Sequence, residues 1–258
     1  MSVHCAPIFS GRYLSASRLL AAIGWQHRQQ GCVPPTARDD RMVIADTFAG
    51  IRREARSRPS NKKAAIAAAD LVRMIAAVRG IGSKAVRDRA VLALGLASAL
   101  RRSELVALEL GDVELVKEGA RITIRSSKSD QDGEGQVIAI PYGQTILPVA
   151  RLKAWLAVRG EAPGRLFTRF AARGELTDLP MSDRAVARLV PKYAALAGLD
   201  PVTVGAHSLR AGFLTEAARS GASLPKMQEV SRQKKLEVLL GYIRSAELFE
   251  DHAGEGFL

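Results

Sequence analysis

Apolar residues recur with a helical period along most of the chain. One predicted helix has four apolar residues at positions i, i+3, i+4 and i+7, followed by the stop signal of Gly80: Leu71, Met74, Ile75 and Val78. The C-terminal half of residues 85–100 is apolar nearly all round, which is typical of a helix buried in a core. Further helical patterns cover these segments: 13–33, 41–57, 145–160, 182–198, 208–221 and 224–245.

The period changes in one place only, between residues 120 and 140. Residues 120–125 and 136–140 alternate or are rich in β-branched side chains, and a polar segment with two glycines joins them. This pattern predicts a β-hairpin with a long polar tip. The expected fold class is therefore mainly α with a small antiparallel β-sheet (α+β).

A basic segment at 52–63 separates two regions of helical pattern. It carries Pro59, Ser60 and Asn61, one acidic residue, and six cations: Arg52, Arg53, Arg56, Arg58, Lys62 and Lys63. We interpret it as a basic interdomain linker, although a solvated run of charge would look the same. The predicted domains are a helical region at 1–57, a linker at 58–63 and a larger domain at 64–258.

Composition narrows the class of protein. The 258 residues are 47% hydrophobic and 25% charged, which excludes intrinsic disorder and predicts a real core. The formal charge is +12, which favours a polyanionic partner but does not separate DNA, RNA and anionic lipid. No apolar run is long enough to span a membrane, the N-terminus lacks a signal-peptide pattern, and the sequence has only two cysteines, so we expect a cytoplasmic protein.

The sequence offers few residues for metal or nucleotide chemistry. Its four histidines have no metal-ligand spacing, and the Walker A and GxGxxG motifs are absent. What remains is a set of separate candidates, each with an ordinary structural alternative. Arg101 could cap a helix, His207 and Arg210 share a helix face by spacing alone, Lys128 could be an exposed loop lysine, and Tyr242 could be a half-buried tyrosine.

In chain order, these candidates resemble the catalytic set of the tyrosine recombinase (phage integrase) family. LASALRRSELVALELGDVEL is similar to the family's first arginine box, with Arg101 in the catalytic place and Glu104 and Asp112 in the acidic positions. IRSSKSD resembles the hairpin that carries the catalytic lysine, and HSLRAGFLTEAARSG resembles the second arginine box. The resemblance covers about residues 64 to 258, preceded by a partial helical core-binding domain of the SAM-like type.

The resemblance implies DNA strand cleavage and rejoining through a 3′-phosphotyrosine. Arg101 and Arg210 would clamp the phosphate, His207 would exchange a proton with the nucleophile Tyr242, and Lys128 would protonate the leaving 5′-oxygen. Cations around Tyr242 would also activate the phenol. The implied partner is double-stranded DNA bound by a homotetramer in the nucleoid, without cofactor, metal or membrane. We further expect Arg56, Arg58, Lys62 and Lys63 to bind the DNA backbone.

Two features depart from the family pattern. Gln233 stands where the family has histidine or tryptophan, nine residues before the tyrosine; its amide can donate a hydrogen bond but cannot carry a proton. Residues 1–57 also resemble only the later part of a core-binding domain. The alternatives are therefore a degenerate member that binds DNA without catalysis and, less favoured, a type IB topoisomerase.

Overall fold

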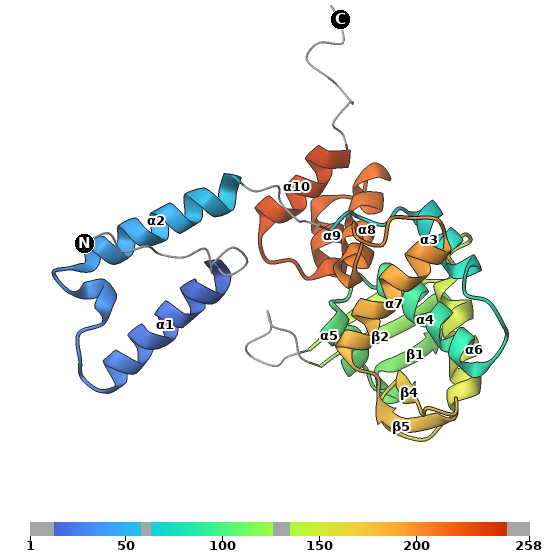
Figure 1. Cartoon of the computed structure of the whole chain (residues 1–258). Coiled ribbons are helices and arrows are strands. Elements are labelled where there is room, and N and C mark those ends of the chain that lie inside the picture. Colours follow the sequence, from blue (N-terminus) through green and yellow to red (C-terminus); the bar gives the residue numbers. More distant parts are fainter. Residues whose placement is uncertain (1–12, 58–62, 126–134, 247–258) are drawn as a thin grey trace, which may run out of the picture. The chain divides into compact units, whose positions relative to one another are not determined.

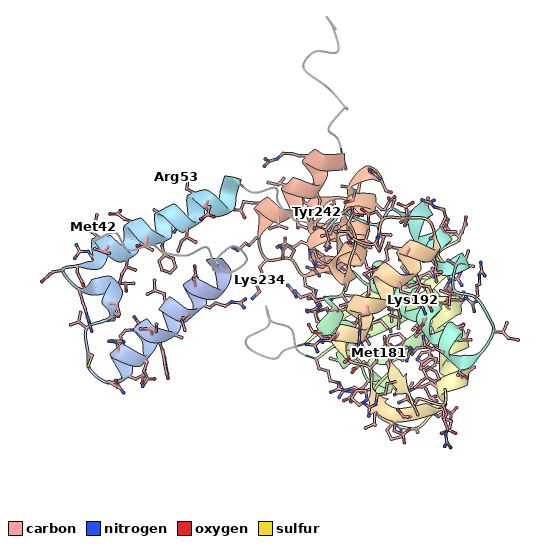
Figure 2. The ribbon with its side chains drawn as sticks, in the orientation of Figure 1. Met42, Arg53, Met181, Lys192, Lys234 and Tyr242 are labelled. Carbon is pink, nitrogen blue, oxygen red and sulfur yellow. The ribbon has the colours of Figure 1, made fainter. Side chains whose placement is uncertain are left out.

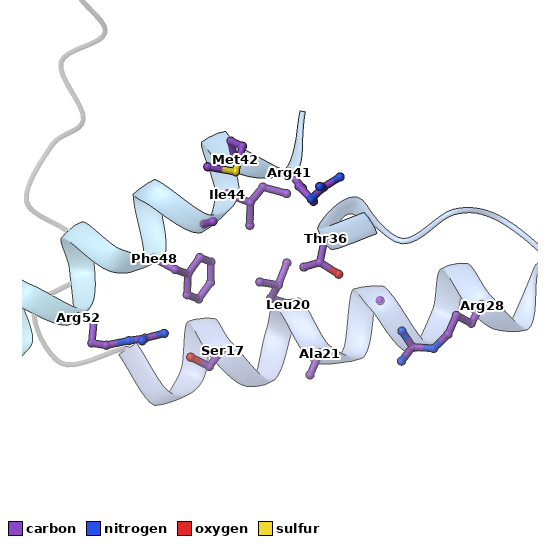
Figure 3. Close-up of a pocket in the computed structure, with 12 residues that line it drawn as sticks. Ser17, Leu20, Ala21, Arg28, Thr36, Arg41, Met42, Ile44, Phe48 and Arg52 are labelled. Atoms are coloured by element: carbon purple, nitrogen blue, oxygen red, sulfur yellow. The ribbon is translucent and has the colours of Figure 1, made fainter. Parts of the chain in front are cut away.

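The computed structural model describes residues 13–57, 63–125 and 135–246, and it divides into two compact units at Lys62 and Lys63 (Figure 1). The first unit is a pair of helices, α1 (Tyr13–Gln29) and α2 (Arg41–Ser57), joined through the short 3₁₀ helix η1 (Pro35–Ala37). Leu20 and Phe48 line the opening between these helices, with three arginines at its borders: Arg28, Arg41 and Arg52 (Figure 3). The helix predicted over 13–33 ends earlier than expected, at Gln29, before the paired prolines Pro34 and Pro35.

The basic segment 52–63 is only partly a linker. Residues 52–57 form the last turns of α2, which ends at Ser57. Arg58 and Lys62 lie outside the described residues, as does the side chain of Arg56. Lys63 is described, and its ammonium group donates a hydrogen bond to the carbonyl of Val202.

The second unit is mostly helical, in agreement with the predicted fold class. Its helices are α3 (Ala68–Ala76), α4 (Ser83–Ala97), α5 (Arg102–Ala107), α6 (Pro148–Arg159), α7 (Asp183–Leu196), α8 (Ala206–Arg219), α9 (Leu224–Ser231) and α10 (Leu236–Ala246). The central helix is α4, which packs against α6 and α8 and buries nearly every residue of its second half. Its all-round apolar pattern is explained by these neighbours.

The predicted β-hairpin is confirmed as β2 (Gly119–Ile124) and β3 (Gln136–Pro141), which pair antiparallel. The 3₁₀ helix η2 (Leu110–Asp112) leads into β1 (Val113–Val116), which adds a third strand on the other side of β2. A separate hairpin consists of β4 (Thr168–Phe170) and β5 (Leu176–Pro180). The sequence pattern missed these three strands because segments of three to five residues are too short to show a period.

The helix α8 approaches the backbone of Ile66, near the start of the second unit, so closely that position 212 requires glycine. A Cβ atom built on Gly212 would lie 2.2 Å from the carbonyl oxygen of Ile66, well inside any allowed contact. The same region is tied by a hydrogen bond from the Ile66 N–H to the Ser208 carbonyl (3.1 Å). The position of α8 is thus set by backbone contact, and α8 carries two candidate site residues.

The single helical pattern predicted over 224–245 is wrong in one respect. The structure breaks it into α9 and α10, and Arg232 at the break has φ 55° and ψ 35°, in the left-handed region. The break turns α10 back against α8, where Leu239 joins a small second core with Leu214 and Met227. A continuous helix could not bury Leu239 in this way.

Candidate active site

Arg101 lies at the start of α5, where the Glu104 carboxylate accepts hydrogen bonds from both its backbone and its side chain. The Arg101 backbone N–H donates to Glu104 Oε2 (2.9 Å), and its guanidinium Nη1 donates to Oε1 (2.6 Å). The first arginine box therefore folds as a helix N-terminus whose acidic residue in the first turn satisfies the capping position. At the end of the preceding helix α4, the C-cap residue is Ser98, whereas Arg101 is the N-cap residue of α5.

Arg210 reaches from α8 to the turn before Arg101. Its side chain is buried, and Nη1 donates to the carbonyl oxygen of Ala99 (2.6 Å). Ala99 has φ 49°, so the turn between α4 and α5 adopts a strained conformation that presents this carbonyl to the arginine. The two arginine boxes, far apart in the sequence, meet at this turn.

A third arginine, Arg232, shares Glu104 with Arg101. Arg232 Nη2 donates to Glu104 Oε2 (2.7 Å), and both side chains are buried. The sequence analysis missed this residue, although a cation directly before the divergent Gln233 was a signal that could have drawn attention to it. Gln233 itself is half-buried in the extended segment between α9 and α10.

The cluster shifts the pKa values of its members. Burial, together with Arg101 and Arg232, lowers the pKa of Arg210 to about 10, which leaves it protonated at neutral pH. Burial, with Arg210 and Arg101 nearby, lowers the pKa of His207 below its ordinary value. This shift favours the neutral imidazole, which is able to accept a proton.

Tyr242 lies on α10, half-buried and packed against the second core (Figure 2). Burial raises the pKa of the Tyr242 phenol, and the nearby charge of Arg210 lowers it by a smaller amount. The expectation that clustered cations activate the free phenol is therefore corrected: burial outweighs Arg210, and the phenol keeps its proton in the free protein. Removal of that proton requires a proton acceptor at the site.

A groove of about 670 Å³ opens beside this cluster, with Arg101 and His207 in its lining. Lys63 also lines it, which brings one of the predicted DNA-binding residues next to the catalytic candidates. Arg102 lies at the same groove and forms an ion pair with Asp183 (3.2 Å). The groove is thus open and cationic, as a site for a phosphodiester backbone would need to be.

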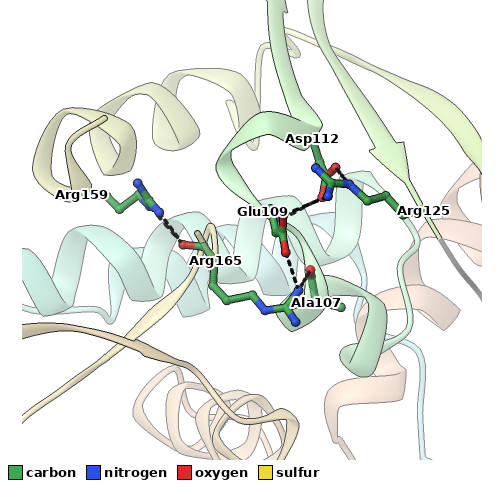
Figure 4. Close-up of polar contacts among 6 residues, drawn as sticks. All are labelled: Ala107, Glu109, Asp112, Arg125, Arg159 and Arg165. Carbon is green, nitrogen blue, oxygen red and sulfur yellow. Dashed lines mark hydrogen bonds and ion pairs between the residues drawn. The ribbon is translucent and has the colours of Figure 1, made fainter. Parts of the chain in front are cut away.

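The base of the predicted catalytic hairpin is held by acidic residues. Arg125, the last described residue before the hairpin tip, donates to Asp112 Oδ1 (2.6 Å) and to Glu109 Oε2 (2.9 Å) (Figure 4). The buried Asp112 also accepts the backbone N–H of Glu109 (2.8 Å). Lys128 itself lies outside the described residues. The second acidic position of the first box therefore has a structural partner at the end of β2.

Within the described part of the chain, no group of three or more His, Cys, Asp and Glu side chains is arranged to hold a metal ion. The same residues contain no helix that is both long and apolar enough to cross a membrane.

The comparison with family models decides the family. The model described as the phage integrase family matches residues 65–248. The chain belongs to this family. The expectation drawn from the sequence motifs is thereby confirmed.

The named relatives of this phage integrase family member are Xer-type proteins. An integrase/recombinase XerD homolog of Selenomonas ruminantium is 38% identical over 170 residues, which cover 65% of this chain and 50% of the relative. The tyrosine recombinase XerD of Xanthomonas campestris pv. campestris is 38% identical over 147 residues, covering 55% and 43%. The chain thus spans about half the length of the curated relatives it matches.

Solved structures of recombinases share the fold. A XerH site-specific recombinase bound to its palindromic difH substrate, in a post-cleavage complex, has a TM-score of 0.59 at 18% identity, covering 72% of this chain and 51% of that one. The XerA recombinase has a TM-score of 0.55 at 18% identity, covering 90% and 77%. At this identity the likeness establishes the fold of the family.

Proposed function

We propose that this chain cleaves and rejoins DNA strands as a site-specific tyrosine recombinase. The observation that carries the proposal is that Arg101 and His207 line one groove, and that the buried Arg210 lies within electrostatic range of both and of Tyr242. Guanidinium groups bind phosphate oxygens with two donors and stay charged, so they stabilise a phosphoryl transition state without a metal.

The proposed step is an in-line displacement at phosphorus. The Tyr242 oxygen forms a bond to the phosphorus of the scissile phosphodiester while the bond to the 5′-oxygen breaks. The phenol proton passes to His207, and Lys128 supplies a proton to the departing 5′-oxygen. The reverse step, with a 5′-hydroxyl from a second strand, rejoins the DNA and requires no external energy source.

The proposed partner is double-stranded DNA bound by a homotetramer in the cytoplasm, at the nucleoid. Among the solved relatives, a XerH recombinase is bound to its difH substrate in a post-cleavage complex, and a lambda integrase dimer is bound to a core site. The cationic groove and the excess of basic residues support DNA as the partner here, and exchange of strands between two duplexes needs four cleaving subunits.

The deciding experiment uses a suicide duplex. A duplex that the protein binds is first selected from a randomised pool, and versions of it are then made with a nick near each candidate phosphate. Wild-type protein is expected to form a covalent protein–DNA adduct that denaturing gels detect. Tyr242→Phe should bind the duplex equally well and form no adduct, because the phenol oxygen is the only atom lost. Tight binding without an adduct in the wild type would favour the alternative of a DNA-binding protein without catalysis.

Gln233→His should raise the rate of adduct formation modestly, by about tenfold or less. Gln233 already has an amide donor, so histidine would add only a charge and the capacity to carry a proton. The rate is measured in single turnover on the suicide duplex, and Gln233→Ala serves as the control that removes the donor. Equal rates for the wild type and Gln233→His would mean that glutamine fully replaces histidine in this site.

The cleavage rate is expected to fall at acidic pH, with a midpoint below the ordinary histidine pKa of about 6.5. Burial and the neighbouring arginines place the pKa of His207 below this ordinary value, so the neutral acceptor is lost only when the pH falls through the lowered pKa. Single-turnover rates across pH, at saturating protein, measure the effect. In His207→Gln the overall rate should be lower and this acidic limb absent; retention of the limb would assign the titration to another group.

DNA binding is expected to weaken steeply with salt. Replacing Arg56, Arg58, Lys62 and Lys63 by alanine should weaken binding to all sequences alike and reduce the slope of log K against log[salt] by about 3 to 4, as expected for four lost phosphate contacts. Fluorescence anisotropy with two unrelated duplexes checks both statements. An unchanged slope would mean that the basic segment is only a solvated tether.

A further inference from the structure

Arg232 occupies a backbone position where glycine is the usual choice. It ends α9 in the left-handed region, with φ 55° and ψ 35°, and its N–H closes the helix on the Gln228 carbonyl (2.7 Å). Glycine would make the same helix end without a strained Cβ. The cost of an arginine here points to a role for the side chain.

The Arg232 side chain is unusual for a buried cation. It is 4% exposed, its Nη2 donates to Glu104, and its Nε and Nη1 have no hydrogen-bond partner among the described residues. Leaving two donors of a buried guanidinium without partners is unfavourable. An apolar side chain would pack at this place without that penalty, so stability alone does not explain the residue.

The contacts of Glu104 suggest what Arg232 does. One oxygen, Oε1, accepts from the Arg101 guanidinium (2.6 Å), and the other, Oε2, accepts from Arg232 (2.7 Å). Arg232 is the buried arginine of this triad, whereas the Arg101 side chain is 28% exposed at the groove. With Arg232 balancing the carboxylate from the inside, the charge of Arg101 is not fully compensated by Glu104.

We propose that Arg232 is a positioning residue whose positive charge offsets the negative charge of Glu104 from the buried side, so that the Arg101 guanidinium keeps its attraction for an anion in the groove. The inference rests on the proposed function in one respect, namely that this anion is the scissile phosphate. Arg210, whose charge also interacts with that of Arg232, completes a site with three guanidinium groups and one carboxylate. Such a surplus of positive charge is what an incoming phosphodiester requires.

Charge removal and its compensation test the proposal. Arg232→Met removes the inner cation with little change in volume and should slow adduct formation about 30-fold or more. Adding Glu104→Gln should then restore much of the rate, because the double variant has the same net charge as the wild type. Glutamine keeps an oxygen that can accept the Arg101 N–H, so the cap of α5 is preserved. Arg219→Met, an exposed arginine on α8, is the matched control and should behave as the wild type.

A second measurement does not depend on cleavage. Inorganic phosphate is titrated against the guanidinium ¹⁵N–¹H signals of Arg101 and Arg210 in the same proteins. Affinity should fall in Arg232→Met and recover in the double variant. If phosphate follows this order while even the wild type forms no adduct, the inference stands and the proposed function fails. Two results would overturn the inference. The first is a wild type that forms adducts, together with a double variant whose rate of adduct formation is lower still than that of Arg232→Met. The second is an Arg232→Met variant that cleaves DNA and binds phosphate as the wild type does.

Discussion

Arg210→Lys is expected to reduce the rate of adduct formation by about 100- to 1,000-fold, the loss typical of removing one fixed donor to a developing oxyanion. Lysine keeps a positive charge but loses the planar pair of donors that binds two phosphate oxygens. It also loses the Nη1 donor that holds the Ala99 carbonyl. Single-turnover cleavage at saturating protein measures the effect.

Arg219→Lys on the same helix is the matched control for this prediction. Arg219 is exposed and, within the part of the chain that the structure describes, forms an ion pair with Glu216 one turn earlier in α8, so its replacement should leave both rate and stability unchanged. Thermal unfolding of both variants separates chemistry from folding. A fall in the melting temperature of Arg210→Lys as large as that of a core truncation would assign Arg210 a mainly structural role.

Gly212→Ala is expected to destabilise the protein by about 3 kcal/mol or more, at the upper end of overpacking effects. The added Cβ would lie 2.2 Å from the carbonyl oxygen of Ile66 and 3.1 and 3.3 Å from its carbonyl carbon and nitrogen, and these are backbone atoms that cannot move aside like a side chain. The helix α8 would have to move away from the segment before α3, which also shifts His207 and Arg210. Chemical denaturation measures the loss in the free energy of unfolding.

Gly241→Ala provides the opposite control in a neighbouring helix. Nothing lies within 4 Å of a Cβ atom at Gly241, and the residue is exposed on α10. Alanine should therefore stabilise the protein by about 0.5 to 1 kcal/mol through its helix propensity. Equal stability of Gly212→Ala and the wild type would show that α8 can shift without loss of packing.

Long periodic segments were predictable from the sequence because their pattern depends on local chain geometry. The apolar face of α3, the buried second half of α4 and the β2–β3 hairpin all follow from the spacing of side chains. Short elements were not predictable in this way. The strand β1 has four residues, and its place beside β2 depends on pairing with a neighbour rather than on a period of its own.

Asp88 illustrates what a one-dimensional pattern cannot show. It lies in α4 and is fully buried, where an isolated carboxylate would be very unfavourable. The structure satisfies it with the hydroxyl of Tyr193, on α7 (2.7 Å), and with Lys84, one turn away (2.7 Å). Burial raises the Asp88 pKa, whereas the charge of the adjacent Arg87 and hydrogen bonds from Lys84, Arg87 and Tyr193 lower it, and the lowering effects prevail. The Tyr193 hydroxyl, which comes from a distant helix, is a partner that no local pattern along the chain predicts.

The family and the catalytic candidates could be inferred without coordinates, because Arg101, His207, Arg210 and Tyr242 stand in motifs whose order and spacing are readable along the chain. How their charges balance emerged only from the folded protein. The sharing of Glu104 by Arg101 and Arg232 depends on the left-handed break after α9, and the raised pKa of Tyr242 depends on burial against α8. Both arise where distant segments meet, and electrostatic energies depend on distance and burial rather than on residue order.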